Sequence, residues 1–87
     1  MIAGDEITAK LKATYPDARV VLEDLTGGAD HWSAVVVTAA FEGHTLIDRH
    51  RMVHAPLQED LSSGRLHALT MKTYTPEQAR DAGILED

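Results

Sequence analysis

The first third of the chain begins with a helical pattern of apolar residues. Apolar side chains recur every fourth position between Gly4 and Tyr15, which predicts an amphipathic helix with one buried stripe: Ile7, Leu11 and Tyr15. Asp5 is suited to the start of this helix, and Pro16 must end it because proline lacks a backbone N–H. The pattern therefore predicts a helix of about three turns.

Two strand-like runs follow this helix. Arg19–Asp24 is rich in valine and leucine, Trp32–Ala39 is a second β-prone run, and the segment Thr26–Asp30 between them is typical of a turn. Both faces of the second run are apolar, with Trp32, Ala34 and Val36 on one and Val35, Val37 and Ala39 on the other. We therefore expect a hairpin with a flexible tip and a central second strand.

The middle of the chain has weaker patterns. Phe41–Thr45 is typical of a turn, and we interpret Leu46–Val53 as an extended piece that runs into a helical turn. Pro56 suits the first position of a short buried helix that contains Leu57 and Leu61. The stop signal for this helix is Ser62-Ser63-Gly64.

The last part of the chain predicts a strand and a capped helix. His67–Thr73 alternates as a half-buried strand does, with His67, Leu69 and Met71 on one face and Ala68, Thr70 and Lys72 on the other. Thr75-Pro76-Glu77-Gln78 is a capping box with proline at the first helical position, so a final helix should run to about Gly83.

The predicted order is helix, strand, strand, short helix, helix, strand, helix. This order predicts an α+β fold with a three-stranded mixed sheet and helices mainly on one of its faces. With 87 residues the chain can build one modest core, so residues 1–87 are expected to form a single domain. The content of 44% hydrophobic and 25% charged residues is that of a folded protein rather than a disordered one.

Charge and cysteine content narrow the possible functions. Eight basic and fourteen acidic residues leave a net charge of −6, which repels phosphate backbones, so any nucleic-acid site must be local. The chain has no cysteine, which excludes disulfides, a thiolate nucleophile and a cysteine-built zinc or iron–sulfur site made by this chain alone. No apolar run approaches the roughly 20 residues of a membrane span, and no secretion signal is present, so we expect a cytoplasmic protein.

Positive charge gathers in the segment Asp48–His54. Its residues Arg49, His50 and Arg51 could form a local patch that binds anions or nucleic acid. The alternative is a solvated turn whose arginines form ion pairs with nearby acidic residues: Asp48, Glu59 or Asp60.

Two other histidines stand at predicted strand ends. His31 follows the glycine-rich hairpin tip, and His67 begins the third strand, so each ring could offer a nitrogen to a metal. The alternative is two surface or hydrogen-bonded histidines. There is no His-Glu-x-x-His pattern, no phosphate-binding glycine loop and no nucleophile elbow, so neither a self-contained zinc site nor an enzyme is expected.

Two separated runs of the chain resemble the BolA family. Leu46–Val53, LIDRHRMV, is similar to the family's arginine–histidine–arginine signature, and Leu66–Gln78, LHALTMKTYTPEQ, is similar to its closing strand and helix cap. The resemblance spans about Asp5–Arg80 and implies a fold similar to the class II K-homology fold. Similarity to a nucleic-acid module does not by itself assign that function.

The resemblance also implies a partner and a cofactor. Members of this family are understood to pair with monothiol glutaredoxins and to share a 2Fe–2S cluster that glutathione also binds. It implies that His67, in the family's His-Ala position, and His31, in the hairpin loop, supply nitrogen ligands, while the partner's cysteine and glutathione supply thiolates. No cofactor is then expected on the isolated chain.

A second function stays open. Relatives are often described as DNA-binding transcriptional regulators, and Arg49, His50 and Arg51 lie in a segment similar to a helix-turn-helix. The net charge of −6 predicts weak DNA binding whose affinity falls steeply with salt.

Overall fold

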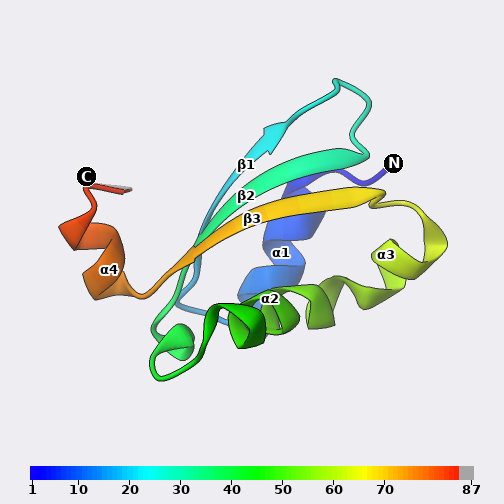
Figure 1. Ribbon diagram of the computed structural model, residues 1–87. Helices are drawn as coiled ribbons and strands as arrows, with labels where there is room; N and C mark the ends of the chain where they lie inside the picture. Colours follow the sequence, from blue (N-terminus) through cyan, green and yellow to red (C-terminus); the bar gives the residue numbers. More distant parts are fainter. Residues whose placement is uncertain (85–87) are drawn as a thin grey trace.

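Three strands form one mixed sheet in the computed structural model, which describes residues 1–84 (Figure 1). The last three positions of the predicted domain therefore lie outside the described residues. The α+β class and the element order are confirmed. The elements in chain order are α1 (Gly4–Thr14), β1 (Arg19–Asp24), β2 (His31–Val37), α2 (Leu46–His54), α3 (Gln58–Ser63), β3 (Ala68–Tyr74) and α4 (Pro76–Asp81), with short 3₁₀ turns η1 (Ala39–Phe41) before α2 and η2 (Ala55–Leu57) before α3.

The predicted central position of β2 is also confirmed. The strand order is β1-β2-β3; β1 runs antiparallel to β2, with Val21 opposite Val35, and β3 runs parallel to β2. The parallel register aligns His31 with Ala68 at one end and Val37 with Tyr74 at the other. Because parallel strands need a crossover connection, the chain passes through α2, η2 and α3 before it returns in β3.

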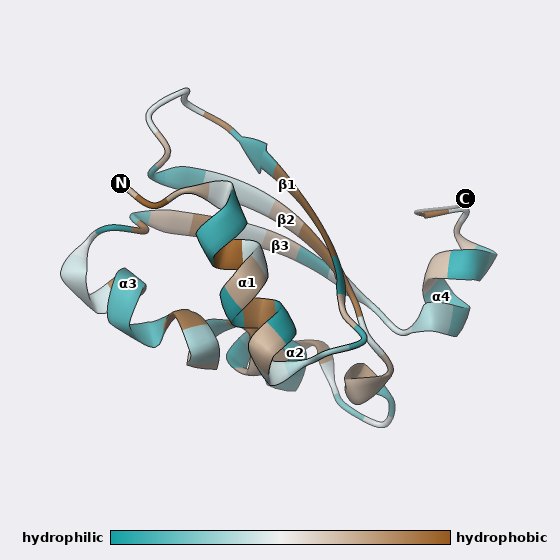
Figure 2. Cartoon of the chain, turned by 180° about the vertical axis from the view of Figure 1, so that it is seen from behind, coloured by the Kyte–Doolittle hydropathy of each residue, from teal (hydrophilic) through white to brown (hydrophobic). Residues whose placement is uncertain are grey.

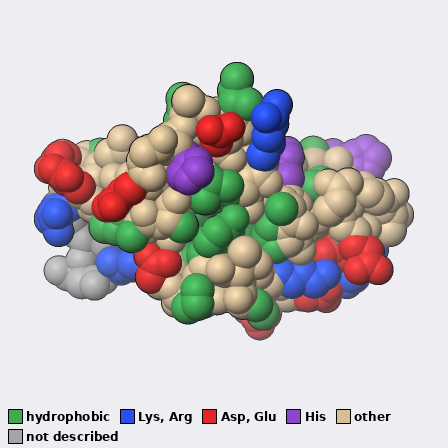
Figure 3. All heavy atoms as spheres, turned by 90° about the horizontal axis from the view of Figure 1, so that it is seen from below, with side chains coloured by type: hydrophobic (Ala, Val, Ile, Leu, Met, Phe, Trp, Pro, Cys, Tyr) green, Lys and Arg blue, Asp and Glu red, His purple; other side chains and the backbone are tan. Residues whose placement is uncertain are grey.

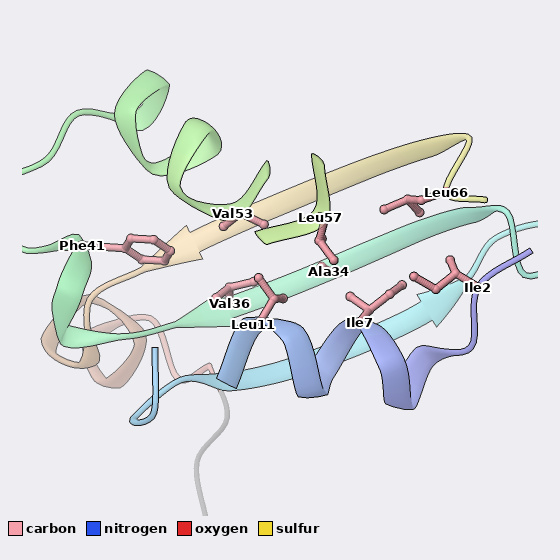
Figure 4. Packing of buried hydrophobic residues seen from close by; sticks show 9 residues of the cluster. All are labelled: Ile2, Ile7, Leu11, Ala34, Val36, Phe41, Val53, Leu57 and Leu66. Carbon is pink, nitrogen blue, oxygen red and sulfur yellow. The ribbon is translucent and has the colours of Figure 1, made fainter. Parts of the chain in front are cut away.

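The helices α1, α2 and α3 cover one face of this sheet, whereas α4 lies past the end of β3 (Figures 1 and 2). The hydrophobic core fills the layer between sheet and helices (Figure 4). Alternate residues of β2 point into this layer, so Ala34 and Val36 are buried. The fully enclosed members of the core come from every part of the layer: Ile2, Ile7, Leu11, Ala34, Val36, Phe41, Val53, Leu57 and Leu66.

One expectation is wrong. The segment from Leu46 to His54 is helical throughout and has no extended beginning. Thr45 caps the helix, because its side-chain oxygen accepts a hydrogen bond of 3.2 Å from the Asp48 N–H. The apolar stripe is hidden in the sequence because the two buried residues of α2 are Val53 and an arginine, Arg49.

Element ends differ slightly from the predicted ones. Pro56 lies in η2, just before α3, and Gly64 ends α3 with a positive φ of 82°. β3 begins at Ala68, so His67 stands at the strand entrance. The capping box of α4 is confirmed, with Thr75 and Gln78 each accepting from the other's backbone N–H. None of the helices in residues 1–84 has the length and apolar character that a membrane crossing requires.

Candidate histidine pair at the hairpin end of the sheet

His31 and His67 lie side by side, although they are far apart in the sequence. β2 begins with His31, and β3 begins one residue after His67, and the two strands run in the same direction. The backbone carbonyl of Asp30 holds both entrances together, because it accepts hydrogen bonds from the N–H groups of His67 at 2.8 Å and Ala68 at 3.1 Å. The parallel register thus brings both predicted ligands to one end of the sheet.

The two imidazole rings are close enough to act together. Their centroids are 5.0 Å apart and their planes are tilted by 41°. The His31 side chain is 37% exposed, and His67 is exposed. Since a metal–imidazole bond is about 2 Å long, rings at this separation can bind one metal atom together.

Asp30 lies beside one of the two ring nitrogens of His31. Its Oδ1 lies 3.1 Å from His31 Nδ1, close enough for an ion pair with a protonated ring but not aligned for a hydrogen bond. The His31 ring is the main cause that holds the pKa of the Asp30 carboxyl below its usual range, and the hydroxyl of Thr26, which donates at 3.0 Å, adds to it. Because His31 Nδ1 is enclosed, Nε2 is the nitrogen that this ring can present outward.

The hairpin tip before His31 is shaped by Asp24. Its Oδ1 accepts from the N–H groups of Thr26 at 3.2 Å and Gly27 at 3.0 Å, and its Oδ2 accepts from Ala29 at 3.0 Å. Gly27 and Ala29 both have positive φ, 78° and 57°, a strained conformation for alanine. The Asp24 carboxylate therefore stabilises the hairpin tip, for which the glycine-rich sequence predicts only flexibility.

The loop before His67 is anchored by an ion-pair network. The buried Asp60 accepts hydrogen bonds from Lys10 of α1 and, at 2.7 Å, from Arg65 of the loop, and Arg65 also pairs with Glu6 at 2.8 Å. The Leu66 side chain is fully buried and its N–H donates to the Asp60 carbonyl at 3.0 Å. The backbone beside His67 is thus tied to α1 and α3.

The donor set of this pair is incomplete for a resident metal. Among residues 1–84, no group of three or more histidine, cysteine or acidic side chains is arranged to hold a metal ion. Two imidazoles without a thiolate correspond to the histidine half of a Rieske-type coordination sphere, in which two histidines bind one iron of the cluster. The residues therefore fit a shared cluster, in which other molecules supply the remaining ligands.

The predicted nucleic-acid residues do not form one surface. Arg49 is only 7% exposed. Its guanidinium donates to the carbonyls of His44 at 3.1 Å and Thr73 at 3.4 Å and to Gln78 Oε1 at 2.8 Å. His50 and Arg51 are exposed on α2. Arg49 thus forms hydrogen bonds where the alternative interpretation expected ion pairs with acidic residues. These bonds join α2 to β3 and α4.

A pocket that no sequence pattern predicts lies between α2 and β3. The pocket has a volume of about 260 Å³ and is lined by Leu46 and His50 of α2 and by Met71, Lys72, Thr73 and Tyr74 of β3. Two apolar residues in the first turn of α2, Leu46 and Ile47, are 64% and 67% exposed. In the sequence, this pair of adjacent apolar residues is the only sign of this exposed apolar site. It cannot indicate the pocket by itself, because the pocket also needs β3 beside α2.

Comparison with known proteins identifies the family. The family model described as "BolA-like protein" matches residues 7–78. The chain is 38% identical to BolA-like protein 2 of Mus musculus over 79 residues, which cover 88% of this chain and 90% of the mouse protein. It is 32% identical over 82 residues to a protein of Escherichia coli (strain K12) named DNA-binding transcriptional regulator BolA, with 86% and 77% covered. Neither relative is named as an enzyme.

Solved structures agree with these sequence matches. The solution structure of the BolA1 protein from Mus musculus superposes with a TM-score of 0.80 at 34% identity, covering 94% of this chain and 72% of that one. Similarity to the K-homology fold stays a prediction. Since the family model spans most of the chain and the mouse relative matches it along nearly its whole length, the chain belongs to the BolA-like protein family.

Proposed function

We propose that this chain is an adaptor that binds a monothiol glutaredoxin and supplies His31 and His67 as ligands to a shared 2Fe–2S cluster. The observation that carries the proposal is the pair of imidazole rings 5.0 Å apart at an open end of the sheet, without a third donor group in the described residues. A role in iron–sulfur trafficking or iron-dependent regulation follows from this chemistry.

The types of ligand that this chain contains support a cluster in which this chain supplies imidazoles and the partner supplies thiolates. When bound, a 2Fe–2S cluster supplies one-electron redox chemistry and a transferable iron–sulfide unit. This chain has no cysteine, so the partner's cysteine and glutathione supply the thiolates. The Asp30 carboxylate lies beside the His31 ring, and the Asp30 carbonyl joins the backbones of both ligands, which supports a fixed spacing of the two residues.

Anaerobic reconstitution tests the proposal. The chain is mixed with a monothiol glutaredoxin, glutathione, iron and sulfide, and followed by visible absorption, circular dichroism and gel filtration. We expect a heterodimer whose spectrum differs from that of the glutaredoxin homodimer. His67→Ala should abolish this spectrum, whereas His44→Ala, which changes an exposed histidine before α2, should leave it unchanged.

A different result would favour a second function. The relative in Escherichia coli is named a DNA-binding regulator, and His50 and Arg51 are exposed on α2 of this chain. If no heterodimer forms, or if the spectrum survives in the double variant of His31 and His67, the ligand assignment is wrong. Binding of duplex DNA at physiological salt that is lost in Arg51→Ala would then support a regulator.

A further inference from the structure

The outer edge of β3 carries backbone groups without a strand partner. In the described residues, β3 is an edge strand that pairs only with β2. The Ala68 N–H donates to Asp30 and the Tyr74 carbonyl accepts from Thr38, so these residues direct their backbone groups toward the β2 side. The backbone N–H and C=O groups of successive residues point to opposite sides of a strand. Those of Leu69, Met71 and Thr73 therefore point to the free edge.

Part of this edge is already occupied. The Thr73 carbonyl accepts from Arg49 at 3.4 Å. Within residues 1–84, no strand pairs with the N–H and C=O groups of Leu69 and Met71 on this edge. Unpaired edges of this kind are templates for strand addition, and proteins use them to bind extended peptides.

The pocket between α2 and β3 lies along the same edge. An added strand would direct alternate side chains into it, over Leu46 and Met71. Figure 3, which looks onto the helical side of the molecule, shows hydrophobic side chains exposed in the middle of this face between histidines. The exposed Leu46, which lines the pocket, offers an apolar contact beside β3.

The charged residue that lines this groove is basic, whereas the whole chain is acidic. Lys72 is the one charged residue among those that line the pocket, and no carboxylate is among them. The whole chain has a net charge of −6. Lys72 is exposed, and a single cation is too few for a phosphate backbone but suits one carboxylate.

We infer that the groove between α2 and β3 binds an extended acidic peptide segment of a partner protein, which adds as a fourth strand beside β3. One apolar side chain of the segment occupies the pocket, its backbone pairs with Leu69 and Met71, and a carboxylate lies near Lys72. The groove follows β3 to Tyr74, whereas the histidine pair lies at the entrance of the strand. This inference therefore does not depend on the proposed function.

Nuclear magnetic resonance with a designed peptide tests the inference. The probe is an acetylated, amidated heptapeptide in which glutamate alternates with valine and leucine, titrated into the ¹⁵N-labelled chain. We expect saturable shifts and slowed hydrogen exchange at the Leu69 and Met71 amides. The same peptide with alternate backbone nitrogens methylated should bind much more weakly, because it lacks the N–H groups that pair with the edge.

A charge reversal gives the matched control. Lys72→Glu should weaken binding of the acidic peptide by about three- to fivefold and improve binding of a lysine version of the peptide. Lys12→Glu makes the same charge change on the exposed surface of α1 and should have little effect. Equal losses in both variants, shifts that leave out Leu69 and Met71, no saturable shift at millimolar peptide, or binding of oligo(dT) in place of the peptide would overturn the inference.

Discussion

At the scale of single residues, Arg49 and Arg51 have different tasks although they belong to the same short motif. Arg49 is enclosed, donates to two carbonyls and one amide oxygen, and lies over the Phe41 ring with its guanidinium carbon 5.7 Å from the centroid. Arg51 is exposed. The family signature therefore contains at least one residue that joins elements of the fold.

This difference predicts unequal effects of the same substitution. Arg49→Ala should lower the free energy of unfolding by about 2 kcal/mol, because it removes a buried side chain and leaves the carbonyl of the buried Thr73 without this donor. Arg51→Ala, on the same helix, should change it by less than about 0.5 kcal/mol. Urea unfolding followed by circular dichroism measures both. If Arg49→Ala unfolds like the wild type, its hydrogen bonds do not stabilise the fold.

At the scale of elements, the turn between α3 and β3 has a backbone requirement. Gly64 has a φ of 82°, where a side chain is strained even though a β carbon added there would meet no other atom within 4 Å. The turn leads directly to Arg65, Leu66 and His67, which link it to α1 and to the histidine pair. The conformation of one glycine thus contributes to the position of a candidate ligand.

We expect Gly64→Ala to destabilise the chain by about 1 kcal/mol, since alanine disfavours the left-handed region. Gly64→Asn should cost less, because asparagine tolerates this conformation better. Thermal unfolding of the two variants measures the difference. Equal losses would mean that the turn rearranges and that the positive φ is not required.

The elements also show why some features are predictable from sequence and others are not. The stripe of Ile7 and Leu11 and the capping box at Thr75 are local patterns, so α1 and α4 could be predicted. The helical start of α2 was missed because Arg49 occupies a core-facing position where an apolar residue is expected. The 5.0 Å separation of the His31 and His67 rings depends on the parallel pairing of β2 and β3, which no local pattern specifies.

At the scale of the whole molecule, acidic side chains hold distant segments together. Glu6 pairs with Arg65 and Lys10, and this contact with Arg65 is the main cause that lowers the pKa of the Glu6 carboxyl. Asp17, in the loop before β1, accepts from the Thr38 hydroxyl at 2.6 Å and the Ala39 N–H at 2.8 Å. These bonds, with that of Thr38 first, lower the pKa of Asp17.

The direction of these shifts determines how stability depends on pH. A carboxyl whose pKa is lower in the folded than in the unfolded chain stabilises the fold fully above its ordinary pKa of about 4. That contribution is lost as the pH falls from there toward the folded-state pKa. Stability of the chain should therefore decline on the acid side, below about pH 4 to 5, as Glu6 and Asp17 take up protons.

Asp17→Asn isolates one of these contributions. At neutral pH the variant should be less stable by about 1 kcal/mol, because asparagine has one acceptor oxygen where the carboxylate uses two, and because exposure to solvent limits the loss. As the pH falls below about 4, the wild-type Asp17 also loses its charge, so the two unfolding curves should converge. Glu42→Gln, an exposed change just after η1, should leave the pH dependence close to that of the wild type. A constant gap between Asp17→Asn and the wild type at all pH values would show that the charge of Asp17 does not contribute to the joint between β1 and the end of β2.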